Sequence, residues 1–220
     1  MWLTLAVTTA SSVSPSPLES VSKRSCDAWG LTLDQPKCRC EAIVRESWGP
    51  VNALVVMSGL PGSGKSSISR ELARRLALPR IELDLIEGPV LSRGVTGDAF
   101  GWAGYEILAN LARDNLGWSS LVLDSVAWTH DIRTTFENIA IHHGAVYCPI
   151  EVVVDAETLD RRLARRWGEI TAADRLERIK RLITLFEPWR SPRLVLDTSE
   201  ELPRLVERAT EYVQARLSPS

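Results

Sequence analysis

One short segment of the chain combines glycines, a lysine and a hydroxyl side chain in a spacing that suits phosphate binding. Residues 59–66 read Gly-Leu-Pro-Gly-Ser-Gly-Lys-Ser and satisfy the pattern G-x-x-x-x-G-K-[ST]. Glycines let the backbone adopt positive φ angles, so that its N–H groups can approach phosphate oxygens. Lys65 can reach the β- and γ-phosphates of ATP, and the Ser66 hydroxyl can complete the shell of a Mg²⁺ ion. The predicted nucleotide-binding residues are Gly59, Leu60, Pro61, Gly62, Ser63, Gly64, Lys65, Ser66 and Ser67.

Two aspartates follow predicted strands and are candidates for catalysis and metal binding. Asp84 ends the segment 80–84 and Asp124 ends the segment 121–124. In a parallel sheet both would lie at the carboxyl edge, beside the glycine-rich loop. The run Leu-Val-Leu-Asp at 121–124 is typical of a Walker B strand, whose carboxylate orients Mg²⁺ or its bound water. Asp84 could accept the proton of an attacking hydroxyl. Either aspartate could instead only cap a helix.

A group of arginines after residue 160 is a candidate for stabilising a transferred phosphate. Arg162 and Arg166 are four residues apart and would share one helix face, as would Arg161 and Arg165. Guanidinium groups stabilise the charge that grows on phosphate oxygens during transfer. The alternative is an ordinary charged amphipathic helix. Residues 161–193 hold ten basic and four acidic side chains, whereas residues 81–131 hold two basic and eight acidic ones.

The elements that must position these side chains follow an alternating pattern. From residue 51 onward, short apolar runs alternate with segments of helical periodicity, which is typical of βα units on a parallel sheet. Strands are predicted at 53–57, 80–84, 121–124, 146–154 and 194–197, with helices between them. The last helix is predicted to start at a capping box formed by Thr198 and Glu201 and to run to Leu217.

Length and composition indicate one globular domain with an added segment. The chain has 220 residues, of which 45% are hydrophobic and 25% are charged. A net charge of −2 gives no overall attraction to nucleic acid, and no apolar run approaches the roughly 20 residues that span a membrane. Residues 1–48 are rich in Ser, Thr and Pro and are predicted to form a poorly structured extension before a domain at 49–220. No basic residue precedes the apolar start, so a cytoplasmic location is expected.

From Val51 to Leu217, about three quarters of the chain, the sequence resembles the small P-loop kinases of the AAA_33 group. This group is related to chloramphenicol phosphotransferase, gluconate and shikimate kinases, zeta toxins and the polynucleotide kinase domain. The resemblance implies an α/β, three-layer P-loop NTPase fold, with a five-stranded parallel sheet of order 2-3-1-4-5, helices on both faces and a short arginine-rich lid. The matching features are the loop at 59–66, Asp84, the strand at 121–125, Arg133, and Asp155 followed by Leu159, Arg162 and Arg166.

The resemblance also implies roles for single residues. Asp84 would be the catalytic base, and Arg162 or Arg166 would belong to the lid that closes over the phosphates. Many members carry an arginine three residues after the catalytic acid, whereas this chain has Glu87 there, so Arg93 or Arg133 becomes a candidate for binding the acceptor. Trp128 lies four residues beyond Asp124, on the loop expected to border the acceptor, and could stack on a sugar or ring.

These observations favour an enzyme that moves the γ-phosphate of Mg-ATP to a hydroxyl of a small molecule. Ser125 follows Asp124 where a mechanical ATPase would have a water-activating acid, and this favours transfer to a hydroxyl over hydrolysis. Two alternatives are a kinase for the 5′-hydroxyl of a polynucleotide, for which segment 161–193 could bind the phosphate backbone, and a nucleotide-binding module without transfer.

We expect a chain that lacks residues 1–48 to fold and to bind Mg-ATP as the full chain does. That segment has no core-forming periodicity, and the first predicted strand begins after Pro50. The melting temperatures of the two chains, measured with and without Mg-ATP, should differ by less than about 2 °C. A collapse of thermal stability on truncation would show that the segment is part of the core.

Overall fold

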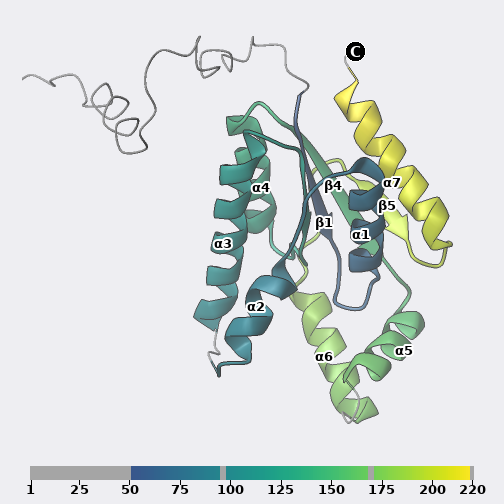
Figure 1. Ribbon diagram of the computed structural model, residues 1–220. Helices are drawn as coiled ribbons and strands as arrows, with labels where there is room; N and C mark the ends of the chain where they lie inside the picture. The colour runs from purple at the N-terminus through teal and green to yellow at the C-terminus, as the bar shows by residue number, and fades with distance from the viewer. Residues whose placement is uncertain (1–50, 95–97, 168–170, 219–220) are drawn as a thin grey trace, which may run out of the picture. The chain divides into compact units, whose positions relative to one another are not determined.

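The computed structural model describes residues 51–94, 98–167 and 171–218, which form a five-stranded parallel sheet (Figure 1). The order across the sheet is β2-β3-β1-β4-β5, and every neighbouring pair of strands is parallel. This confirms the predicted fold class and strand order. The strands are β1 (Ala53–Ser58), β2 (Arg80–Glu82), β3 (Leu121–Asp124), β4 (Val146–Val153) and β5 (Leu194–Asp197).

Seven helices lie in the described part of the chain, and none of them is long and apolar enough to cross a membrane. The helix that starts within the predicted second strand was not expected. The helices are α1 (Lys65–Leu76), α2 (Leu83–Leu91), α3 (Asp98–Leu116), α4 (His130–His142), α5 (Ala156–Trp167), α6 (Ala172–Leu185) and α7 (Leu202–Leu217).

The second strand is shorter than predicted, and this moves Asp84. Strand β2 ends at Glu82, and Asp84 lies in the first turn of α2. Two periodicities overlap here, because Ile81, Leu83 and Leu85 alternate as in a strand while Leu83 and Ile86 have helical spacing. Both pack into the same core. The prediction that Asp84 ends a strand is therefore wrong, although the residue still follows the carboxyl end of β2.

The sheet is covered on both faces, as predicted, because successive side chains of β1 point to opposite sides. Ala53, Val55 and Met57 pack with α1 and α7, and Leu54 and Val56 pack with α3 and α4. Figure 1 shows these two pairs of helices on opposite sides of the sheet. Helices α5 and α6 pack on each other at one end of the sheet. We refer to α5 and α6 as the lid.

The predicted capping box before α7 does not form. The helix begins at Leu202 with Glu201 as its cap, and no side chain makes a capping hydrogen bond there. The Thr198 hydroxyl instead donates to the carbonyl oxygen of Ser63, over 2.9 Å. This side chain therefore ties the end of β5 to the glycine-rich loop.

Candidate functional site

The glycine-rich loop connects β1 to α1 and has a backbone shape that its glycines alone permit. Gly59 has φ of 145°, and Gly64, the N-cap of α1, has φ of 100°. A Cβ atom on Gly59 would lie 2.4 Å from the carbonyl oxygen of Val152, so space also excludes a side chain there. The Gly59 N–H donates to the carbonyl oxygen of Val126. The loop is thus fixed against β4 and the segment after β3, with the N-terminus of α1 opening onto it.

Lys65 is the buried cation of this loop. Its side chain is at the first position of α1, and the residue is only 8% exposed. Burial lowers the pKa of Lys65, and the negative charges of Asp124 and Asp84 oppose that effect. A buried ammonium group close to carboxylates is suited to an anionic ligand, because phosphate oxygens can replace the lost hydration.

Asp124 is buried at the end of β3 and has one oxygen satisfied and one free. Its Oδ2 atom accepts hydrogen bonds from the Ser69 hydroxyl and from Arg80 Nη2, each over 2.7 Å. Its Oδ1 atom is buried without a hydrogen-bond partner among the described residues. An unpaired carboxylate oxygen beside the loop that carries Ser66 fits a Mg²⁺ ion, which prefers oxygen ligands. The described residues contain no cluster of three or more His, Cys, Asp or Glu side chains that could hold a metal ion by themselves.

Arg80 holds the second oxygen of Asp124 and was missed by the sequence analysis. Its Nε atom donates to the Ser69 hydroxyl over 2.8 Å, and its Nη2 atom lies 2.7 Å from oxygens of both Asp124 and Glu82. Burial acts to lower the pKa of Arg80, but the bonds and charges of Asp124 and Glu82 raise it on balance. The contact depends on the pairing of β2 with β3, which places Glu82 opposite Asp124. The sequence alone does not show this pairing.

A cavity of about 460 Å³ brings three of the four predicted catalytic residues together. Lys65 comes from the glycine-rich loop, Asp84 from α2 and Arg166 from the lid. Arg166 Nη2 donates to Asp84 Oδ2 over 3.1 Å. Both side chains are more than half exposed, so this ion pair is readily exchanged for a ligand. The full lining is Pro61, Lys65, Asp84, Val126, Trp128, Arg166, Arg181, Leu182 and Leu185.

Arg162, the fourth predicted catalytic residue, lies on α5 beside the loop and is not in the lining of this cavity. Its Nη1 atom donates to the carbonyl oxygen of Ser63 over 3.0 Å and to the Thr198 hydroxyl over 2.9 Å. A weaker contact of 3.4 Å reaches the carbonyl oxygen of Gly62. Of the two arginines expected in the lid, Arg166 therefore faces the cavity, while Arg162 braces the loop.

Arg133, predicted to bind the acceptor, is a buried structural residue. Its guanidinium group donates to the carbonyl oxygens of Ala127, Trp128 and Glu187, over 2.7, 2.9 and 2.8 Å. It also lies 4.3 Å from the centre of the Trp189 ring. The residue is 3% exposed and does not line the cavity. Its donors hold the loop of Trp128 against the segment after α6. A contact of Arg133 with the acceptor stays a prediction.

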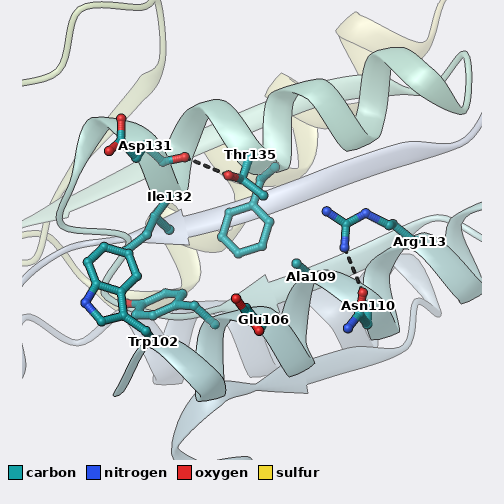
Figure 2. Close-up of a pocket in the computed structure, with 10 residues that line it drawn as sticks. Trp102, Glu106, Ala109, Asn110, Arg113, Asp131, Ile132 and Thr135 are labelled. Atoms are coloured by element: carbon teal, nitrogen blue, oxygen red, sulfur yellow. Dashed lines mark hydrogen bonds between the residues drawn. The ribbon is translucent and has the colours of Figure 1, made fainter. Parts of the chain in front are cut away.

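A second cavity, of about 390 Å³, lies between α3 and α4 (Figure 2). Trp102, Ile132 and Phe136 give it an apolar wall, while Glu106 and Arg113 add charge. None of the predicted catalytic or nucleotide-binding residues lines it. The chemistry inferred from the sequence therefore belongs to the cavity beside the loop.

Together, the parallel sheet, the loop and the cavity define a P-loop NTPase fold with a kinase-like site. Residues 54–189 match the AAA_33 family, described as an AAA domain. This match spans more than half of the chain, and the protein belongs to that family. The predicted family resemblance is thereby confirmed.

Three known proteins show what the chain is similar to. It is 26% identical over 154 residues to a probable adenylyl-sulfate kinase of Aeropyrum pernix, covering 66% of this chain and 82% of that one. A gluconokinase structure from Sinorhizobium meliloti shares the fold with a TM-score of 0.56 and 19% identity, covering 76% and 93%. An adenylyl-sulfate (APS) kinase structure from Mycobacterium tuberculosis, in complex with AMPPNP and APS, has a TM-score of 0.57 and 17% identity, covering 76% and 99%.

We predict that Lys65→Ala loses the stabilisation that Mg-ATP gives to the wild type. A ligand at 100 times its dissociation constant adds about 2.7 kcal/mol to the free energy of unfolding. Without the buried cation, the variant should lose most of this increment. Thermal unfolding with and without Mg-ATP measures it, and Lys180→Ala, an exposed lysine of α6, is the control. An equal shift in Lys65→Ala would contradict the assignment of the loop.

Arg80→Met should destabilise the protein by about 3–5 kcal/mol, because it leaves the charges of Asp124 and Glu82 buried without their partner. Urea unfolding measures this loss. The matched control is Arg208→Met, which breaks an ion pair of 2.6 Å between more exposed side chains. Removing the charge of Asp124 as well, in Arg80→Met/Asp124→Asn, should recover part of the loss. If Arg80→Met cost no more than the control, the network would not be a stabilising one.

Proposed function

We propose that the protein transfers the γ-phosphate of Mg-ATP to a hydroxyl group of a small molecule. The observation that carries this proposal is the cavity that Lys65, Asp84 and Arg166 share. A phosphate-binding lysine, a carboxylate and an exchangeable cation are the groups that phosphoryl transfer to an alcohol needs. A module that only bound nucleotide would have no use for a carboxylate placed beside the phosphate-binding lysine.

The nucleotide would be bound by the loop. Its backbone N–H groups and Lys65 would take the β- and γ-phosphate oxygens, and Ser66 with the free oxygen of Asp124 would hold Mg²⁺. The bound ion supplies neutralising charge to the phosphates. Arg162 acts indirectly, because it fixes the loop carbonyl groups and so the direction of the N–H groups.

The transfer itself would use Asp84 and Arg166. The acceptor oxygen forms a bond to the γ-phosphorus while the bond from that phosphorus to the β–γ bridging oxygen breaks, and ADP leaves. The proton of the acceptor hydroxyl passes to the Asp84 carboxylate. Arg166, which pairs with Asp84, would turn to the γ-phosphate oxygens and free the carboxylate to accept that proton.

The variant Asp84→Asn tests this role, because Asn keeps the shape of the side chain and removes its basicity. We expect Mg-ATP affinity within a few-fold of wild type and kcat lower by about 10² to 10⁴. Affinity by calorimetry and turnover by release of ADP measure the two quantities, and Asp114→Asn on the exposed surface of α3 is the control.

Two other outcomes for Asp84→Asn would assign the residue differently. Near-wild-type turnover would show that Asp84 is only an acidic residue of the first turn of α2 and takes no proton. A joint loss of ATP affinity and turnover, restored by raised Mg²⁺, would make Asp84 a metal ligand instead.

A further inference from the structure

The cavity beside the loop is rich in hydrogen-bond donors and poor in acceptors. Its polar side chains are Lys65, Arg166, Arg181, Trp128 and Asp84, and only Asp84 brings a charged acceptor. The Trp128 indole N–H is buried and has no acceptor among the described residues. A ligand that fills this space must supply acceptor oxygens, because unpaired donors are costly once water is excluded.

This inference rests on the proposed function. Under that function, two of these donors have no role in binding ATP or in transferring the phosphate. Lys65 and Arg166 would bind the phosphates of ATP, and Asp84 would take the proton of the hydroxyl. Arg181 and Trp128 are left over. Arg181 forms no ion pair or hydrogen bond with any described residue, so its charge is available.

Arg181 lies on α6, and Trp128 lies on the loop between β3 and α4. This loop contacts the end of α6, and both residues line the same part of the cavity. Arg181 and Leu185 are four residues apart and share a face of α6. The Glu187 N–H, two residues further on, donates to the carbonyl oxygen of Trp128 over 2.9 Å. Arg133 donates to the same oxygen, so Trp128 is held in place beside the end of α6. Neither residue comes from the nucleotide-binding loop.

We propose that the acceptor is a hydroxyl compound that also carries an oxyanion, a carboxylate, sulfate or phosphate, and that Arg181 binds this group. The apolar or ring portion of the acceptor packs on Trp128, Leu182 and Leu185. A guanidinium group recognises an oxyanion with two parallel hydrogen bonds, which fixes orientation as well as affinity. Arg181 is thus the residue that determines which alcohols are phosphorylated.

The test uses the full chain, Mg-ATP and matched pairs of hydroxyl compounds that differ in one oxyanion. The pairs are gluconate with sorbitol, glycerol 3-phosphate with glycerol, and glucose 6-sulfate with glucose, so that carboxylate, phosphate and sulfate are distinguished. We expect turnover with an anionic member and at least 100-fold lower kcat/KM with its neutral partner. The variant Arg181→Met should raise KM for the anionic acceptor about 10- to 100-fold and leave KM for Mg-ATP within two-fold.

The matched control is Lys180→Met, which removes the same charge from the neighbouring position of α6 without touching the cavity. Equal use of the neutral partners would overturn the inference, as would an effect of Arg181→Met no larger than that of Lys180→Met. A rise in KM for Mg-ATP instead of the acceptor would assign Arg181 to the nucleotide and would also overturn it.

Binding measured without transfer separates this inference from the proposed function. Calorimetry titrates each compound into protein that holds Mg-AMPPNP. If no compound is phosphorylated but an anionic one binds, and Arg181→Met abolishes that binding, the proposed reaction fails and the anion site stands. If the neutral compounds are phosphorylated and bind as well as the anionic ones, the reaction stands and the anion site fails. If no anionic compound shows Arg181-dependent binding, the anion site is wrong.

Discussion

The buried carboxylate of Asp124 is the interaction on which the rest of the site depends. One of its oxygens is shared by Arg80 of β2 and Ser69 of α1, so a single group joins two strands and the helix that follows the phosphate loop. Burying this charge would be unfavourable without the guanidinium group and the hydroxyl. Because these donors all use the same oxygen, the other oxygen stays free. The network that stabilises the edge of the sheet therefore also leaves free the oxygen that we propose as a ligand of Mg²⁺.

A second set of contacts links the phosphate loop to the lid and to the acceptor side. Arg162 and Thr198 hold the carbonyl oxygen of Ser63, and Arg133 holds the loop of Trp128 against the end of α6. Both arginines donate mainly to backbone carbonyl oxygens, so they hold chain segments together. Arg166 differs from them, since its partner is an exposed carboxylate. A turn of the Arg166 side chain would exchange that pair without disturbing the contacts of Arg162 and Arg133.

Much of the fold and of the loop could be predicted from the sequence, because both depend on local patterns. Short apolar runs that alternate with helical segments predict the strands, and the spacing of the glycines, Lys65 and Ser66 predicts the nucleotide site. The carboxylate network could not be predicted, because Arg80 reaches Asp124 only after β2 pairs with β3. The role of Arg133 was likewise hidden, since its three acceptors are backbone oxygens with no sequence signature. Segment 161–193 contains ten basic residues, so the sequence alone does not single out Arg181. Its position in the lining of the cavity does.

We propose that the free oxygen of Asp124 and the phosphate loop together form the site of a metal-bound triphosphate. A crystal structure of the full chain with Mg²⁺ and AMPPNP tests this most directly. We expect the triphosphate on the loop amides and Lys65, the metal beside Ser66 and the Oδ1 atom of Asp124, and Arg80 still bonded to Oδ2. A metal bound away from Asp124, or a nucleotide whose phosphates lie outside the loop, would contradict it.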